Sequence, residues 1–391
     1  MRRLSHFVAA SLIIGFAAVG GSADARPEST GPFEPGSDWH VVAPADLDMD
    51  SNMLEASRAY AFEEGRNTQG VVVVRRGAIA AEWYAPDRGP DSWGASWSMA
   101  KSFTSALIGI AIDDGLIPSV DEPMTTYYPA WAGTPRDAIT VRDVLQMASG
   151  LHWNEEYDPE AAEGATSHII ELVLFQPDEL AYVSELEFET EPGTVFNYSS
   201  GDTMLLSGVI EQATGMSVGE YAQQELFGPI GIDQVEWWQD AEGHTLTYCC
   251  LDMPSRDFAR MGLLFLNRGT WGDEAVVPAQ WVTDSTEPSP AYDGYGYQWW
   301  LIGREDERLP ADTYAAQGHD GQFIYVIPSL DLVVVRNGTY DKFDGPAVAE
   351  PNLYGRYPSD SRGDQLGTML PEIGWDQAEF LLPIVESIQD A

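Results

Sequence analysis

The sequence predicts an α+β protein in which strands from both ends of the chain form one antiparallel sheet. Two observations carry this prediction. Several apolar runs of strand length occur within residues 71–84 and within residues 295–336. Segments with helical spacing fill most of the chain between these two regions. We therefore expect a discontinuous sheet domain, residues 46–105 and 290–391, flanked by helices and interrupted by a mostly helical domain, residues 106–289.

The first 25 residues are typical of a secretory signal peptide. Arg2 and Arg3 precede an apolar segment at 7–20, and Ala23-Asp24-Ala25 fits the small-x-small cleavage pattern. Residues 26–45 are rich in Pro, Gly and Ser and are interpreted as a linker. We therefore expect an exported protein, periplasmic or extracellular, with no membrane span after signal removal.

The sheet domain is expected to start with a helix and a hairpin. Residues 47–64 have helical character and stop at Gly65. Residues 71–74 are four consecutive valines, which predicts a strand covered on both faces. A short turn ending in Gly77 separates it from a second strand at 78–84.

A long apolar segment follows, and it holds a serine and a lysine three positions apart. The run from Met99 to Ile112 has apolar residues on nearly every side, which predicts a buried helix ending near Gly115. Ser98, at the start of this helix, would face Lys101 one turn later. The helix N-terminus would add free N–H groups and a partial positive charge.

Ser98 and Lys101 form a chemically sensible pair. A serine hydroxyl is a poor nucleophile until a base removes its proton. A lysine buried in an apolar core loses solvation, so its pKa falls and the neutral amine can act as that base. An exposed helix cap beside a solvated lysine would give the same spacing, so the motif needs support from elsewhere in the sequence.

Helix signals dominate the middle of the chain, and strand signals return near its end. Capping boxes precede two of the helices, at Thr140 and at Ser217. The expected helices begin at these two caps or occupy residues 201–214, 256–267 and 377–388. The expected strands occupy residues 295–302, 313–317, 322–327 and 332–336.

The composition excludes several classes of function. The chain has 62 acidic and 20 basic residues, a formal net charge of −42, and such a surface repels nucleic acid and anionic membranes. The 6 histidines show no metal-ligand spacing, and the sequence lacks the Gly-x-Ser-x-Gly turn of α/β-hydrolases. We expect a small-molecule substrate, no metal and no cofactor; the oligomeric state stays open.

Three motifs in order resemble those of the serine β-lactamase and penicillin-binding-protein family. Ser98-Met99-Ala100-Lys101 resembles its Ser-x-x-Lys motif. Residues 191–200 resemble the Pro-Gly-x-x-Phe-x-Tyr-Ser-Asn segment of the class C-like branch. The stretch from Gly318 to Phe323 stands where the family has Lys-Thr-Gly. The resemblance covers roughly residues 50–340 and is closest to 6-aminohexanoate-dimer hydrolases and family VIII carboxylesterases.

The resemblance implies a β-lactamase/transpeptidase-like fold and a set of roles. Ser98 would be the acylated nucleophile, and Lys101 and Tyr198 would share the work of general base and acid. The Tyr198 phenolate would be favoured by the neighbouring amine. The N–H groups of Ser98 and Gln322 would form the oxyanion hole, with Gln322 on an edge strand where Gly321 leaves room for substrate.

Two departures from the family pattern bear on the substrate. His319 replaces the lysine of the third motif, which weakens a fixed cation for a substrate carboxylate. Ser200 replaces the asparagine of the second motif, a residue that contacts substrate in relatives. We therefore expect a serine hydrolase for esters or amides. A class C-like β-lactamase or D-alanyl-D-alanine carboxypeptidase, and a non-catalytic ligand-binding relative, are the alternatives.

Three further features have two interpretations each. Cys249 and Cys250 are adjacent and could form a vicinal disulfide or remain buried thiols. Five tryptophans could line an apolar cleft, although most are expected in the core: Trp153, Trp237, Trp238, Trp299 and Trp300. An acidic segment is expected to be a solvated loop, or to repel anionic substrates at the cleft mouth: Glu155, Glu156, Asp158, Glu160 and Glu163.

Overall fold

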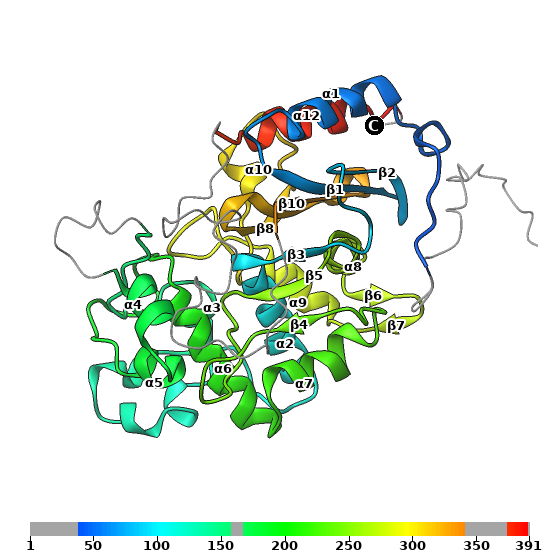
Figure 1. The fold of residues 1–391 in the computed structure, drawn as a ribbon. Helices are drawn as coiled ribbons and strands as arrows, with labels where there is room; N and C mark the ends of the chain where they lie inside the picture. The colour runs from blue at the N-terminus through cyan, green and yellow to red at the C-terminus, as the bar shows by residue number, and fades with distance from the viewer. Residues whose placement is uncertain (1–37, 158–166, 341–373, 390–391) are drawn as a thin grey trace, which may run out of the picture. The chain divides into compact units, whose positions relative to one another are not determined.

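The computed structural model describes residues 38–157, 167–340 and 374–389. A five-stranded antiparallel sheet has the strand order β2-β1-β10-β9-β8 (Figure 1). Its strands are β1 (Thr68–Arg75), β2 (Ala78–Tyr84), β8 (Tyr314–Gly318), β9 (Gln322–Ile327) and β10 (Leu332–Gly338). The predicted α+β fold with a sheet built from both ends of the chain is confirmed. The expected signal peptide and most of the expected linker lie outside the described residues.

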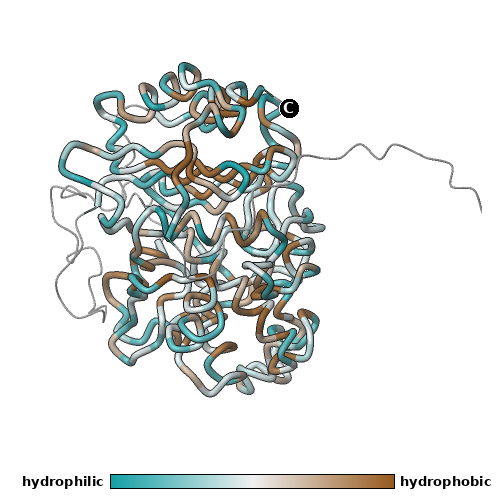
Figure 2. The backbone as a smooth tube through the Cα atoms, turned by 90° about the vertical axis from the view of Figure 1, so that its right-hand side faces the viewer, coloured by the Kyte–Doolittle hydropathy of each residue, from teal (hydrophilic) through white to brown (hydrophobic). Residues whose placement is uncertain are grey.

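The side chains of β1 alternate between two hydrophobic cores. Val71 and Val73 pack in the core that contains helices α1 (Ser51–Ala61) and α12 (Gln377–Glu386), whereas Val72 and Val74 pack in the core that contains α8 (Ser255–Leu266). Figure 1 shows α1 and α12 on one face of the sheet and α8 on the other. Because both faces are covered, β1, β9 and β10 are buried along their whole length and rich in apolar residues, as the brown segments of Figure 2 show.

Helices are the main regular elements of the chain between β2 and β8. It includes a small three-stranded sheet, β3 (Trp93–Ala95), β5 (Leu251–Pro254) and β4 (Glu236–Trp237), and the hairpin β6 (Thr270–Trp271) and β7 (Glu274–Ala275). Its other α-helices are α2 (Ala100–Asp113), α3 (Val141–Leu145), α4 (His168–Phe175), α5 (Glu179–Ser184), α6 (Ser200–Thr214), α7 (Val218–Ala222), α9 (Ala279–Ser285) and α10 (Ile302–Glu305). The division at residues 105/106 and 289/290 stays a prediction.

Local sequence signals set several helix ends. Thr140 and Ser217 both form complete capping boxes, each with an acidic residue three positions later. Gly215 ends α6 in the left-handed region that favours glycine. Helix α1 starts at Ser51, later than expected, because the side chain of Asp50 accepts a hydrogen bond from the N–H of Asn52 and caps the helix there.

The expected strand at 295–302 was wrong. The chain turns back on itself there: the N–H of Gly296 donates to the carbonyl of Trp299 at 2.9 Å, and Gln298 has a positive φ of 63°. Residues after Leu301 form helix α10. The alternation of aromatic residues is typical of a strand, but here the residues form a compact turn. Its rings pack on different sides, Tyr295 against Phe196 and Trp299 against Phe265.

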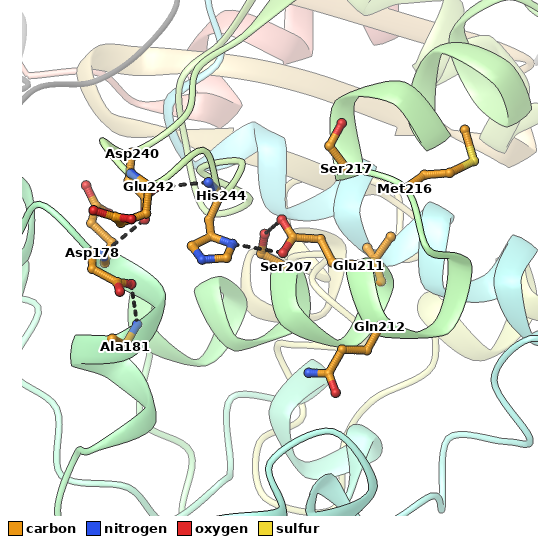
Figure 3. Close-up of polar contacts among 12 residues, drawn as sticks. Asp178, Ala181, Ser207, Glu211, Gln212, Met216, Ser217, Asp240, Glu242 and His244 are labelled. Carbon is orange, nitrogen blue, oxygen red and sulfur yellow. Dashed lines mark hydrogen bonds and ion pairs between the residues drawn. The ribbon is translucent and has the colours of Figure 1, made fainter.

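A polar cluster ties the loop before β5 to helices α5 and α6 (Figure 3). Nδ1 of His244 lies 2.8 Å from Oε2 of Glu211 on α6. The carboxylate of Asp240 accepts hydrogen bonds from the N–H groups of His244 and Glu179, at 2.8 and 3.0 Å. These contacts hold the segment that leads to Tyr248, which reaches the candidate site.

Among the described residues, no helix has the length and apolar character needed to cross a bilayer. In the same part of the chain, no cluster of three or more His, Cys, Asp or Glu side chains could hold a metal ion.

Candidate active site

Ser98 lies at the junction between β3 and α2. It is the middle residue of a short 3-10 turn, Trp97–Met99, and its neighbours on both sides are buried whereas Ser98 itself is partly exposed. Trp97 has a positive φ of 44°, an unusual conformation for a residue of this size. The chain therefore turns sharply before α2 and leaves Ser98 partly exposed at the helix N-terminus.

Lys101 is buried one turn into α2, with a relative exposure of 1%. Its Nζ atom lies 2.9 Å from Oγ of Ser98, 3.0 Å from Oγ of Ser200 and 3.0 Å from the carbonyl oxygen of Tyr248. Burial lowers the pKa of Lys101 to about 8, and the negative charge of Glu155 opposes this shift. A substantial neutral fraction is therefore present at mildly alkaline pH.

Tyr198 completes the group around Ser98. Its phenol lies close enough to the Ser98 side chain for that side chain to influence the pKa of Tyr198, and the centroid of its ring lies 5.1 Å from Nζ of Lys101. Burial and the charge of Glu155 raise the pKa of Tyr198 above its usual value, and the Ser98 contact only partly offsets this. The expected phenolate was therefore wrong, because desolvation and a nearby carboxylate outweigh the amine.

Glu155 was interpreted as part of a solvated loop, and this was wrong. Its two carboxylate oxygens accept hydrogen bonds from the N–H of Ser200 at 2.9 Å and from its hydroxyl at 2.6 Å. Trp153 and Tyr157 also donate to it. Glu156 is exposed, as expected. Asp158, Glu160 and Glu163 lie outside the described residues.

Ser200 is fully buried between Glu155 and Lys101. The contact with substrate that its place in the second motif implied is therefore replaced by a contact with the lysine. A hydroxyl can accept from the amine and donate to the carboxylate at the same time, which an asparagine side chain would do with two separate groups.

The expected edge-strand position of Gln322 was also wrong, because β8 is the outer strand and Gln322 begins β9 inside the sheet. Ala315 of β8 exchanges two main-chain hydrogen bonds with Trp300 on the side away from β9. Main-chain groups alternate between the two sides of an antiparallel strand. Gln317 therefore turns its N–H to the free edge, whereas Gln322, paired with Gly318, turns its N–H toward β8.

The third motif forms the turn between β8 and β9. At Gly321, which has a φ of +75°, a Cβ atom would lie 2.4 Å from Nη1 of Arg336, so this glycine makes room for the arginine rather than for substrate. The buried Arg336 donates to the carbonyls of Asp320 and Gly321, at 2.7 and 2.6 Å. At Gly318, a Cβ atom would lie 2.2 Å from the carbonyl oxygen of Ser96, so the end of β8 packs directly against the segment before Ser98.

His319 is half-buried beside the site. Its Nδ1 atom lies 2.7 Å from Oδ1 of Asp320, and its ring packs against the rings of Tyr157 and Trp97, with centroids 4.8 and 6.2 Å away. The adjacent carboxylate compensates any positive charge on the imidazole. His319 is therefore not an isolated cation like the lysine that it replaces.

Aromatic side chains pack next to one another beside Tyr198. The ring of Trp300 lies 5.4 Å from that of Tyr198, and Phe196 packs against Tyr292 at 4.7 Å and against Trp300 at 6.3 Å. These side chains are half-buried, so they leave an apolar wall partly open to solvent. Of the five tryptophans considered, Trp300 is part of this wall and Trp153 contacts Glu155; the other three are core residues.

Cys249 and Cys250 are joined by a disulfide, which settles the alternative in favour of the vicinal bridge. Both residues are buried. The bridge directly follows Tyr248, whose carbonyl contacts Lys101. It thus lies in the main-chain segment that carries one of the three partners of the lysine.

Local sequence patterns gave no sign that Glu155 lies against Ser200 or that the N–H of Gln317 faces the free edge of β8, and they did not single out Phe196, which packs against Trp300. Glu155 lies in a loop whose acidic composition indicated solvent exposure, and nothing in the local pattern marks one carboxylate as inward-facing. The direction of the Gln317 N–H is a property of the main chain and carries no sequence signal. Phe196 occurs within the quoted second motif, and this was the one available signal.

The comparisons with known proteins agree with this geometry. The Beta-lactamase family model matches residues 56–350. Over 288 residues, the chain is 27% identical to the 6-aminohexanoate-dimer hydrolase of Paenarthrobacter ureafaciens, a match that covers 69% of this chain and 72% of the relative. The chain belongs to the beta-lactamase family, and it is a serine hydrolase of the β-lactamase-related type, which acts on ester and amide bonds.

Solved structures show the same fold. A Bacillus anthracis protein, described as a candidate 6-aminohexanoate-dimer hydrolase, has a TM-score of 0.65 at 20% identity and covers 78% of this chain and 83% of its own. A family VIII carboxylesterase has a TM-score of 0.59 at 16% identity and covers 79% and 96%. At these identities the likeness concerns the fold alone.

Proposed function

We propose that this enzyme hydrolyses a neutral or cationic ester or linear amide through an acyl-enzyme on Ser98. The observation that carries the proposal is the 2.9 Å separation between Oγ of Ser98 and Nζ of a fully buried Lys101. A buried amine with a lowered pKa is the base that a serine nucleophile needs near neutral pH.

In the proposed reaction, Lys101 takes the proton of Ser98 while the hydroxyl oxygen attacks the carbonyl carbon. Tyr198, as a neutral phenol, donates its proton to the departing alcohol or amine and recovers one from the Lys101 ammonium. Water then attacks the acyl-enzyme and gives up a proton to the same pair of residues. The product acid leaves, and Ser98 is restored.

The N–H of Ser98 and the outward N–H of Gln317 are the proposed oxyanion donors. Gln317 replaces Gln322 in this role because its N–H faces the free edge of β8, and the neighbouring Gly318 packs against the main chain just before Ser98. Preorganised main-chain donors stabilise the negative charge of a tetrahedral intermediate.

The substrate class follows from the walls of the site. Asp320 compensates His319, so a substrate carboxylate has no lone cation to bind there. The rings of Trp300, Phe196 and Tyr292 favour an uncharged apolar group. These features favour esters and linear amides over penicillin-type substrates, which carry a carboxylate. The 6-aminohexanoate dimer named for the Paenarthrobacter relative is a linear amide, but it also carries a carboxylate, so the same features favour esters and amides without a carboxylate over it.

The test is hydrolysis of p-nitrophenyl butyrate, the linear dimer of 6-aminohexanoate and nitrocefin by the wild type and by Ser98→Ala. We expect turnover of the ester or the amide by the wild type, at most weak turnover of nitrocefin, and none by the variant. Retained turnover in Ser98→Ala would refute the acyl-enzyme on Ser98. Nitrocefin as the best substrate would move the assignment to a β-lactamase.

Export is a second part of the proposal, supported by the N-terminal sequence pattern. N-terminal sequencing of protein recovered from the periplasm or the medium should find a start close to residue 26. An intact N-terminus on protein confined to the cytoplasm would contradict it.

A further inference from the structure

We infer that Glu155 is a positioning residue that acts through Ser200 to aim Lys101 at Ser98, so that the lysine accepts the proton of the serine. This inference rests on the proposed function, since it concerns the base of the same reaction. It adds a residue outside the three sequence motifs, and it gives a direction to each hydrogen bond around the amine.

The first step concerns the carboxylate. An ionised carboxylate only accepts hydrogen bonds, and Glu155 receives them from the N–H of Ser200 at 2.9 Å, the hydroxyl of Tyr157 at 2.8 Å and the indole of Trp153. Ser200 is the first residue of α6, so the positive end of that helix also faces Glu155. Glu155 is therefore held in one place.

The second step concerns Ser200. Its hydroxyl hydrogen is committed to Oε1 of Glu155, 2.6 Å away. Toward Nζ of Lys101, 3.0 Å away, the Ser200 oxygen can then only accept. Without a strong acceptor at Glu155, the hydroxyl could rotate and donate to the amine instead.

The third step concerns Lys101. The carbonyl of Tyr248 also can only accept. A neutral amine has two hydrogens and one lone pair, and both hydrogens are taken by Ser200 and Tyr248. The lone pair is left for the third neighbour, Ser98, at 2.9 Å. The network thus makes Ser98 the donor and Lys101 the acceptor, which is the direction that acylation requires.

Other ionisable groups around Lys101 do not provide this orientation. The rings of Tyr198 and Tyr248 face the amine with their centroids 5.1 and 5.6 Å away. Glu179 lies behind Tyr248 and accepts from its hydroxyl, so its carboxylate is turned to Tyr248 and not to the amine, and burial raises the pKa of Glu179 well above its usual value. Asp202, on α6, is turned to Ser149. Glu155 is the carboxylate that acts on the charge of Lys101.

The experiment measures the rate at which a fluorophosphonate probe labels Ser98 between pH 5.5 and 10, because labelling needs no knowledge of the natural substrate. In the wild type the rate should rise with pH as Lys101 loses its proton. Glu155→Gln has nearly the same shape but no charge. It should move the midpoint about one unit toward lower pH, because the ammonium loses its counter-charge. The maximal rate should fall about tenfold, because Ser200 is no longer fixed as an acceptor.

Two further variants make the outcome decisive. Glu156→Gln removes one charge from the neighbouring exposed position and should leave both midpoint and maximal rate unchanged. Ser200→Ala removes the relay and should lower the maximal rate at least as much as Glu155→Gln. Circular dichroism and thermal melts check that each variant is folded.

The possible results separate cleanly. An unmoved midpoint in folded Glu155→Gln overturns the inference, even if the maximal rate falls, since a structural role alone would lower the rate without moving the midpoint. A shift of equal size in Glu156→Gln also overturns it, because general charge would then be the cause. Failure of the wild type to label at Ser98 would instead count against the proposed function.

Discussion

Nζ of Lys101 lies 3.0 Å from the carbonyl oxygen of Tyr248. The base proposed for the reaction is thus tied to the main chain of a segment that comes from 147 residues further along. That segment is fixed in turn, because the hydroxyl of Tyr248 donates to the buried Glu179 at 2.7 Å. The acceptor is a main-chain group, and the side chain at position 248 fixes where it lies.

The first prediction concerns the role of Lys101. Lys101→Met keeps most of the apolar contacts of the side chain and removes the amine, so kcat/KM for p-nitrophenyl butyrate should fall by about 10³-fold. The wild-type activity should rise with pH around a midpoint near 8, because only the neutral amine can accept the serine proton. Initial rates from pH 6 to 10 measure both effects. A variant with unchanged rates would exclude Lys101 as the base.

The second prediction concerns the oxyanion donor. Gln317→Pro removes the main-chain N–H that faces the free edge of β8, where proline is tolerated. We expect kcat to fall by about 10²-fold with a smaller change in KM. Gln317→Ala is the matched control, because it loses the side chain but keeps the N–H, and it should retain activity. Equal losses in both variants would argue against a main-chain donor at this position.

The third prediction concerns the aromatic wall. Trp300→Phe keeps a ring next to Tyr198 but reduces the apolar surface, whereas Trp300→Ala removes the ring. In Trp300→Ala, kcat/KM for the butyrate ester should fall about tenfold more than for the acetate ester, because only the longer acyl chain reaches the lost surface. For Trp300→Phe, the difference between the two esters should lie between those of the wild type and Trp300→Ala. The same loss for both esters would mean that Trp300 supports Tyr198 without contacting the acyl chain.

The fourth prediction concerns a buried acid. Asp202 is 1% exposed, and burial raises its pKa to about 7, although hydrogen bonds with Ser149 oppose the shift. A raised folded-state pKa means that the native state binds more protons than the unfolded state between about pH 4 and 7. Relative to its ionised form, protonated Asp202 therefore stabilises the native state at low pH, and this stabilisation is lost as the pH rises through 7.

Replacement of Asp202 tests this assignment. Asp202→Asn should flatten the dependence of Tm on pH between 4 and 7 and stabilise the protein at pH 8 by about 2 kcal/mol. The exposed Asp293 offers a control, since Asp293→Asn removes a charge without removing a buried group. A Tm profile for Asp202→Asn that follows the wild type would show that this carboxyl titrates normally.

The fifth prediction concerns the pair in Figure 3, His244 and Glu211. The hydrogen bond to Glu211 raises the pKa of His244 above its usual value. The pair therefore stabilises the protein below about pH 6.5, and the effect is lost as the pH rises through the raised pKa. His244→Gln should lower Tm by about 2 °C at pH 5.5 and have no effect at pH 9. An equal loss at both values would indicate packing rather than charge.

The sequence was sufficient wherever a signal is local. Four consecutive valines gave a strand that both cores cover, and the capping boxes at Thr140 and Ser217 set helix starts because their hydrogen bonds span three residues. The spacing of Ser98 and Lys101 placed their side chains together because one helical turn fixes that distance.

Only the tertiary structure decided which distant groups meet at Lys101. Glu155 and Tyr248 lie 54 and 147 residues from it, and nothing in their local sequence records that one carboxylate and one carbonyl would be turned inward. The edge of the sheet was likewise not visible in the third motif. Whether the N–H of Gln317 or that of Gln322 faces the free edge depends on how β8 and β9 pair. Arg336 donates to the turn that joins these two strands. Local patterns fix helices and strands through short-range geometry. The protonation of Lys101 and the direction of its hydrogen bonds depend on burial and on partners that come together only after the chain has folded.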